Sequence, residues 1–467
     1  MGKFDRFSLN QNGDYEFTIE DLEDEEATMD LAMSSIDGSS QELGSLTKHP
    51  RDRRLKTERV ALYTLLAFAF AMFIGLIPLS WKKKNESFTM ADSFKGIGQQ
   101  TFIQCSGSER KVPLEDWLQQ DMSDISSLCD PTFLGHSRKA NPTHTPVKVF
   151  IMMGEANMFG TGTIEGNVEG TLHHAVNHKN RFAHLKASQS GQGYWAAPRN
   201  DVRHVAVHND FEIVENNWLT INENRGYFGP EIQFGYVMGE FFDEPVLIIK
   251  AAQGHATLGG EMLPPGSQEF NHDGYVYAGY GDSPRRWEAG TSHIASNSWH
   301  AGMKYDQHVA NVKKILRNIG QYYPGASTYE IAGFVWWQGD SDRRIDAYTA
   351  KYEENLVRLI NALRFDFRSP HAPFVVASLG MDGKDMSGST LDIAQAQLNM
   401  ASNDKYPENT GNVDAIDTRA AWRGPYQPGH NGDHNYLDGP HYGNNAETVM
   451  EVGNAMALSM ARLIVQE

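Results

Sequence analysis

An uninterrupted apolar stretch near the amino end constrains this chain more than any other feature of its sequence. Residues 60–80, VALYTLLAFAFAMFIGLIPLS, carry no charged side chain. As a helix rising about 1.5 Å per residue they would cover about 30 Å, the hydrocarbon thickness of a bilayer. Buried helices of soluble proteins rarely run this long without a charged or amide side chain, and a cleaved signal peptide would begin near residue 1. We therefore predict a transmembrane signal-anchor helix at 60–80 that contacts the lipid bilayer.

The charges beside this stretch predict its orientation. Six Lys or Arg residues lie within 48–59 and three at 82–84, and the more basic flank normally faces the cytoplasm. The expected protein is a single-pass type II membrane protein of the Golgi, the secretory pathway or the plasma membrane, with residues 82–467 lumenal or extracellular. Its two cysteines, Cys105 and Cys129, lie in that part, where thiols oxidise readily, so we expect one disulfide between them. Two free buried thiols are the alternative. Asn85 opens a glycosylation sequon beside the membrane.

The segments on either side of the stretch have unlike compositions. Residues 1–55 contain the acidic run EDLEDEE and few large apolar residues, which predicts a disordered acidic cytoplasmic tail. Residues 82–145 are polar and end in NPTHTP, which is typical of a stem or linker. The whole chain has 41 Lys+Arg against 59 Asp+Glu and a formal charge of −18. That charge has the wrong sign for a broad phosphate-binding surface, so nucleic acid is not an expected partner.

Residues 146–467 alternate short apolar runs with longer amphipathic segments. The apolar runs, rich in β-branched residues, lie at 147–153, 246–251, 331–337, 374–379 and 413–417. Between them, apolar positions recur with helical spacing, as at 309–319 and 356–363. Continuous apolar strands separated by amphipathic helices predict an α/β, doubly wound parallel sheet covered on both faces. In that architecture ligands bind at the carboxyl ends of the strands, so a motif directly after a strand is a candidate for the functional site.

Four short motifs follow one another in this domain. They are GEANM at 154–158, FGPE at 228–231, WWQGDSD at 336–342 and DGPH at 438–441. In order and approximate spacing they resemble the sialate O-acetylesterase-type branch of the SGNH hydrolases, which carries Gly-Gln-Ser-Asn-Met, Gly-Pro-Glu, Trp-x-Gln-Gly-Glu-Ser and Asp-x-x-His. The resemblance covers 146–467. It implies a flavodoxin-like SGNH hydrolase fold and a carbohydrate esterase that removes acetyl esters from sugars or polysaccharides, with no cofactor and no metal.

The resemblance also implies a serine-type acyl transfer with named roles. His441 matches the general base, and Asp438 matches the carboxylate that orients it, because a turn between them brings the carboxylate back to Nδ1 and leaves Nε2 free. The nucleophile position falls on Ala156. Oxyanion or substrate contacts are expected from Gly229 through its N–H, from the Gln338 side-chain amide, and from Asn157 and Glu155 in the first turn.

The nucleophile position is where the chain departs from the family. Ala156 stands in place of the serine and Glu155 in place of the glutamine before it, and a methyl group cannot attack a carbonyl. Three explanations remain open. Another hydroxyl (Thr161, Thr163 or Ser341) or a water activated by His441 does the chemistry; the domain is a catalytically inactive pseudoenzyme that binds O-acetylated glycans; or an inactivating substitution interrupts an otherwise active domain. An O-acetyltransferase, which would need an acyl donor, is a further alternative.

Overall fold

The computed structural model of the chain describes residues 102–104, 111–113, 142–187, 194–208, 211–296, 298–423 and 440–466. The predicted tail at 1–55, the predicted transmembrane helix at 60–80, the sequon at Asn85 and both cysteines lie outside the described residues, as does Asp438. All described residues belong to one compact unit, 89–467. Within the predicted stem, β1 (Phe102–Gln104) and β2 (Lys111–Pro113) form an antiparallel pair.

The described chain folds around a seven-stranded sheet with the order β14-β13-β12-β3-β8-β5-β6. Every neighbouring pair is parallel except β5–β6, which is antiparallel at one edge. The strands are β3 (Val147–Gly154), β5 (Val202–His208), β6 (Glu212–Trp218), β8 (Val246–Ala252), β12 (Tyr329–Trp337), β13 (Phe374–Ala377) and β14 (Val413–Ile416). The doubly wound, mostly parallel α/β sheet predicted from the sequence is confirmed.

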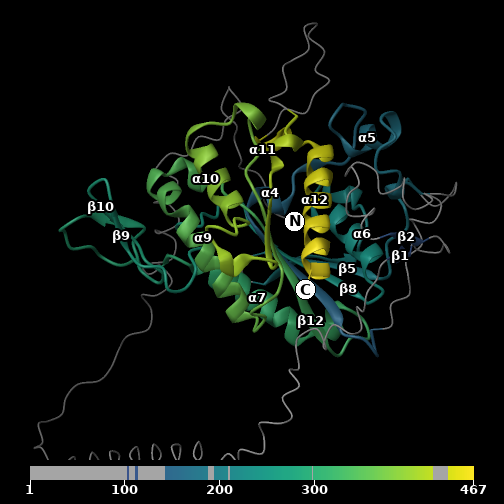
Figure 1. Cartoon of the computed structure of the whole chain (residues 1–467), viewed down its shortest axis with the longest axis horizontal. Coiled ribbons are helices and arrows are strands. Elements are labelled where there is room, and N and C mark those ends of the chain that lie inside the picture. Colours follow the sequence, from purple (N-terminus) through teal and green to yellow (C-terminus); the bar gives the residue numbers. More distant parts are fainter. Residues whose placement is uncertain are drawn as a thin grey trace, which may run out of the picture. The chain divides into compact units, whose positions relative to one another are not determined.

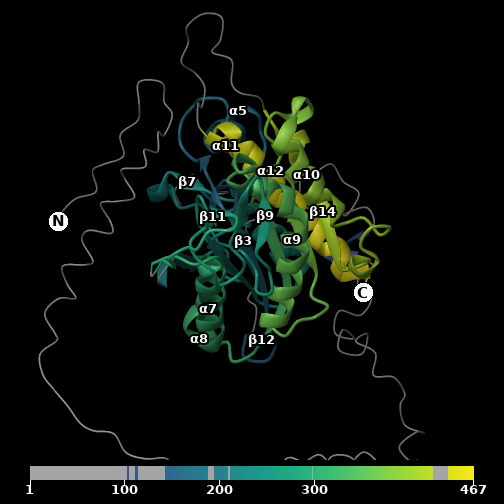
Figure 2. The same ribbon diagram turned by 90° about the vertical axis from the view of Figure 1, so that its left-hand side faces the viewer.

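Helices cover both faces of this sheet. In Figures 1 and 2, α6 and α12 lie on one side, and α7, α9 and α10 lie on the other. The α-helices are α4 (Ala156–Phe159), α5 (Leu172–His178), α6 (Glu231–Phe241), α7 (Met303–Arg317), α8 (Ile319–Tyr322), α9 (Asp346–Asp366), α10 (Gly388–Asn399), α11 (Pro440–Gly443) and α12 (Ala446–Gln466). This double cover buries every residue of β3 and β8, whose sequences are apolar apart from Lys148 and Lys250.

Shorter elements complete the fold. β4 (Gly162–Thr163) pairs with β7 (Tyr227–Phe228), and β9 (Phe270–His272), β10 (Tyr275–Tyr277) and β11 (Arg286–Glu288) form a separate antiparallel sheet. Single turns of 3-10 helix are η5 (Ala183–Leu185), η6 (Glu223–Arg225), η7 (Asp342–Arg344), η8 (Gly383–Asp385), η9 (Pro407–Asn409) and η10 (Thr418–Ala421). The small β9–β11 sheet lies in the long connection between β8 and α7.

The long helix α12 is apolar over Ala446–Val465. Within the described part of the chain it is the one helix that is long and apolar enough to cross a membrane, but most of it is buried inside the domain. It packs against α6, β13 and β14. Burial on this scale explains the composition, since a helix enclosed by a sheet edge and a second helix needs apolar residues around most of its circumference. We interpret α12 as a core helix.

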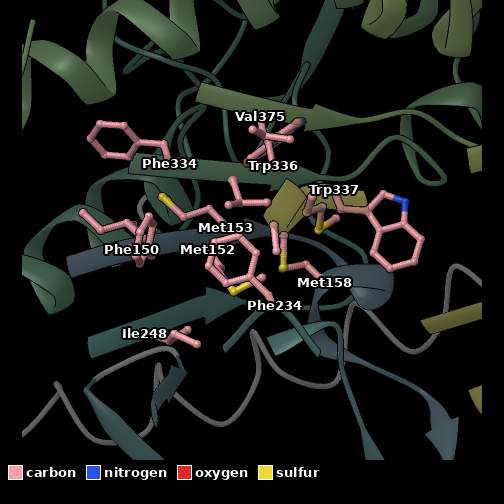
Figure 3. Close-up of a cluster of buried hydrophobic side chains, with 14 of the residues drawn as sticks. Phe150, Met152, Met153, Met158, Phe234, Ile248, Phe334, Trp336, Trp337 and Val375 are labelled. Atoms are coloured by element: carbon pink, nitrogen blue, oxygen red, sulfur yellow. The ribbon is translucent and has the colours of Figure 1, made fainter. Parts of the chain in front are cut away.

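The core places two strand ends side by side. Figure 3 shows large side chains of β3, β8 and β12 packed together, among them Trp336 and Trp337, which are both 0% exposed. β3 and β12 are neighbours, with Trp337 paired to Gly154 at their carboxyl ends. The chain leaves β3 for the β8 side of the sheet and later returns to its other side as β12. This reversal makes a topological switch point, where open α/β sheets bind ligands.

Candidate active site

A buried carboxylate ties together the turns that follow β3 and β12. Glu155 is 1% exposed. Its Oε1 accepts hydrogen bonds from the N–H groups of Gly339 (2.7 Å), Asp340 (2.5 Å) and Ser341 (3.3 Å), and its Oε2 accepts one from Ser341 Oγ at 2.6 Å. We call this arrangement the carboxylate clamp. It brings the first and third sequence motifs, which are more than 180 residues apart, into direct contact.

The clamp carboxyl has an unusual affinity for protons. Burial raises the pKa of Glu155 to about 7, while the hydrogen bond from Ser341 opposes the rise and the nearby Asp340 and Asp342 carboxylates add to it. A carboxyl that titrates near neutral pH can give and take a proton under physiological conditions. The glutamine that the resemblance expects at this position has no such capacity.

His441 reaches the same edge of the sheet from α11. Its backbone has φ 62° and ψ −105°, a conformation that residues other than glycine rarely adopt. The side chain is 14% exposed, and its Nδ1 lies 3.8 Å from Oδ2 of Asp340. Burial lowers the pKa of His441, the Asp340 carboxylate opposes this, and Arg344 and His255 lower the pKa further. The imidazole is therefore mostly neutral near pH 7, as a general base must be.

Asp340 is the carboxylate that the structure places beside the histidine. Its Oδ1 accepts from Arg343 Nε at 2.8 Å and its Oδ2 from Arg344 Nη2 at 2.9 Å. Burial would raise the pKa of Asp340, but His441 and the two arginines outweigh burial and lower it. Sequence reasoning assigned the orienting role to Asp438, which lies outside the described residues. The signal for Asp340 was the acidic residue directly after Gln338-Gly339.

The expected nucleophile position lies at the start of α4. Ala156 is the first residue of that helix and is half-buried, and its methyl group offers no nucleophile. The next residue, Asn157, is buried, and neither polar atom of its side chain has a hydrogen-bond partner among the described residues. Asn157 thus keeps a free amide close to the clamp, as the resemblance implies for a substrate-binding residue.

The Gly229 N–H, an expected oxyanion donor, is already engaged. It donates to Oε1 of Glu231 at 3.0 Å, while Oε2 of Glu231 accepts from Lys250 Nζ at 2.7 Å. The turn is nevertheless close to the site: a Cβ on Gly160 would lie 2.2 Å from the Gly229 Cα. Gly229 is where the motifs place it, but its donor is not free in this geometry because Glu231 takes it.

The Gln338 side chain has no free donor either. It is 0% exposed, and its Nε2 donates to the Ala256 carbonyl at 3.0 Å and to Asp342 Oδ2 at 2.5 Å. Its Oε1 accepts from the Tyr352 hydroxyl at 2.9 Å. Gln338 therefore stabilises the turn after β12 through these hydrogen bonds. This geometry gives no support to the expected oxyanion role of its amide.

One group of side chains in the described part has the composition of a metal site. His204, Glu215 and Glu231 place ligand atoms within 4.8 Å of one another. His204 Nδ1 lies 2.9 Å from Glu215 Oε2, and the ammonium of Lys250 already pairs with Glu231. Because Lys250 supplies the positive charge that the acids require, the group is satisfied as a buried ion-pair network, and we assign no metal to it.

Comparisons with known proteins agree with the motifs. Residues 281–461 match the family model described as carbohydrate esterase, sialic acid-specific acetylesterase. This segment runs from before α7 into α12 and contains the Gln338 turn and His441, but not Ala156. No curated protein matches the chain.

Several solved structures resemble the chain. A protein from Arabidopsis thaliana shares 17% identity at a TM-score of 0.37, covering 68% of this chain and 98% of that one. A carbohydrate acetylesterase from Xanthomonas citri shares 12% at 0.40, covering 68% and 57%, and NanS shares 13% at 0.33, covering 62% and 80%.

The family match is consistent with the parallel sheet and with the sequence motifs that its segment contains. The family model of sialic acid-specific acetylesterases thus matches residues 281–461, in agreement with the resemblance that the motifs indicated.

Proposed function

We propose that this protein hydrolyses acetyl esters on sugars or polysaccharides. The observation that carries the proposal is the neutral, half-buried His441, whose Nδ1 lies 3.8 Å from the ionised Asp340 at the switch point of the sheet. A histidine next to a carboxylate takes a proton from an attacking hydroxyl or water and returns it to a leaving group. A protein that only binds glycans has no need of a histidine arranged in this way.

We further propose that the domain is displayed from a membrane. The support is the uncharged run at 60–80 and the excess of basic residues before it. In that arrangement the domain faces the lumen or the exterior, where acetylated glycans are found, as a type II protein would place it.

A glycan-binding pseudoenzyme is the second candidate, and three observations favour it. Ala156 lacks a hydroxyl, and the expected donors on Gly229 and Gln338 are both engaged within the protein. Such a protein would bind O-acetylated glycans saturably without turnover, and its affinity would not change when His441 is replaced.

Ester hydrolysis by the full chain distinguishes the two candidates. The natural chain, Ala156→Ser and His441→Ala are compared on an aryl acetate and on an O-acetylated sugar. We expect Ala156→Ser to raise the rate by at least about 10²-fold, because it restores the nucleophile of a triad enzyme. We expect His441→Ala to lower the rate of the natural chain by about 10²-fold or more.

Two results would contradict the hydrolase. If neither the natural chain nor a folded Ala156→Ser protein hydrolyses either ester, the site is not assembled as we propose. If an active natural chain keeps its rate after His441→Ala, the base is misassigned.

A further inference from the structure

We propose that Ser341 replaces the missing serine as nucleophile, with Glu155 as the base that takes its proton. This inference rests on the proposed esterase function and names the attacking atom for it. It concerns a residue pair that the serine-type motif of the family does not use, because the motif places its nucleophile at the position of Ala156.

The geometry of the clamp separates the two oxygens of Glu155. Oε1 receives all three backbone N–H groups of the β12 turn, which fix the carboxylate in place. Oε2 receives the Ser341 hydroxyl at 2.6 Å, its one partner in the part of the chain that the structure describes. Oε2 thus accepts a hydrogen bond from a serine hydroxyl, and the hydrogen bonds to Oε1 fix the orientation of the carboxylate. This is the arrangement of a nucleophile and its base.

The position of the hydroxyl also suits a nucleophile. Glu155 is buried, whereas Ser341 is half-buried, so the serine is the more exposed partner of the pair. Its chain neighbour Asp340 contacts His441. The other hydroxyls weighed from the sequence have no such base: among the described residues, the side chains of Thr161 and Thr163 make no hydrogen bond with a carboxylate or a histidine.

The two departures from the family motif then explain each other. Replacing serine by alanine at 156 removes one nucleophile, and replacing glutamine by glutamate at 155 supplies a base to a different hydroxyl. Burial brings the pKa of Glu155 to about 7, which suits a base that works near neutral pH.

The reaction balances in two half-steps. Ser341 Oγ bonds to the acetyl carbon and its proton passes to Glu155 Oε2. The bond from that carbon to the sugar oxygen then breaks, and the sugar oxygen leaves with the proton from Glu155. Water attacks the acetyl-Ser341 ester, His441 takes the proton of the water and passes it to Ser341 Oγ, and acetic acid is released.

The experiment traps the acetyl group on the enzyme. The full-length His441→Ala variant is incubated with an aryl acetate, quenched in acid, digested and analysed by peptide mass spectrometry. Because His441 serves the second half-step, we expect an acetyl group to accumulate on Ser341. The adduct is expected to vanish in His441→Ala/Ser341→Ala and in His441→Ala/Glu155→Gln.

Steady-state rates separate a nucleophile from a structural hydroxyl. We expect Ser341→Ala to lower the rate by at least about 10²-fold, while Ser387→Ala, an exposed serine that caps no helix by a side-chain hydrogen bond, keeps the natural rate. Adding Ala156→Ser to Ser341→Ala supplies a new nucleophile and should restore hydrolysis, which also shows that the Ser341→Ala protein is folded.

Three outcomes overturn the inference and leave the esterase function intact: a natural rate in Ser341→Ala, an acetyl adduct on another residue, or a natural rate in Glu155→Gln. If the natural chain binds acetylated glycans but turns over no ester, the proposed function itself fails.

Discussion

The stability of the protein should depend on pH through Glu155, and the replacement Glu155→Gln isolates that dependence. Burial carries the pKa of Glu155 from its ordinary 4.5 to about 7 in the folded protein. Between those two pH values the folded chain holds a proton that the unfolded chain has already lost. The folded state is therefore destabilised as the pH rises through this window, and a pKa difference of this size corresponds to about 3 kcal/mol.

The glutamine side chain fits the clamp without titrating. Its oxygen can accept from the N–H groups of Gly339 and Asp340, and its amide can donate to Ser341 Oγ, which then acts as acceptor. The free energy of unfolding of Glu155→Gln, minus that of the natural chain, should therefore grow by about 3 kcal/mol between about pH 4 and pH 8. We expect this variant to be less active, because Glu155 is the proposed base.

Urea denaturation followed by circular dichroism at several pH values measures this difference. The matched control is Glu354→Gln on the exposed side of α9. The hydrogen bonds from Lys351 and Arg358 lower the pKa of Glu354. Glu354→Gln should therefore change the free energy of unfolding with the opposite pH dependence and by less than about 1 kcal/mol. If the free energies of unfolding of Glu155→Gln and the natural chain differ by the same amount at every pH, the reasoning is refuted.

Two further predictions follow from the site. Gly160→Ala should destabilise the protein by more than about 3 kcal/mol, because the new Cβ would lie 2.2 Å from the Gly229 Cα and because residue 160 has a φ of 99°. Thermal unfolding measures the loss. The control is Gly254→Ala, whose Cβ would meet nothing within 4 Å. Asp340→Asn removes the carboxylate that raises the pKa of His441, so that pKa should fall further. An unchanged acidic limb of the pH–rate profile would show that the two groups do not interact.

Most of the sheet could be predicted from apolar runs, and the exceptions have a common cause. β3, β8, β12 and β13 are covered on both faces, and their sequences are apolar apart from Lys148, Glu330 and Lys250. β5 reads VRHVAVH and β6 reads EIVENNW. β6 is the antiparallel edge strand and is partly exposed, and β5 beside it places His204 2.9 Å from Glu215 of β6, so neither strand forms an apolar run.

The approach of the motif turns to one another was predictable from the sequence, but their side-chain contacts were not. The motifs placed the turns of Glu155, Gly229 and Gln338 at one edge of the sheet, and the structure brings these turns together. The sequence could not reveal that Glu231 would accept the hydrogen bond of the Gly229 N–H. Nor could it reveal that Asp342 would accept a hydrogen bond from the Gln338 amide. Such side-chain contacts depend on turn geometry and on burial, neither of which leaves a periodic pattern.

The approach of Gly160 to Gly229 belongs to a longer series of backbone contacts. A Cβ on Gly453, in the middle of α12, would lie 2.4 Å from the carbonyl oxygen of Pro230, which directly follows Gly229. Three separate segments therefore touch main chain to main chain, with no rotatable side chain between them to absorb a displacement. A substrate that pushes on the turn after β3 must move the start of α6 and the core helix α12 with it. These three segments are in this sense coupled, and we expect any adjustment to substrates of different size to come from the side of His441.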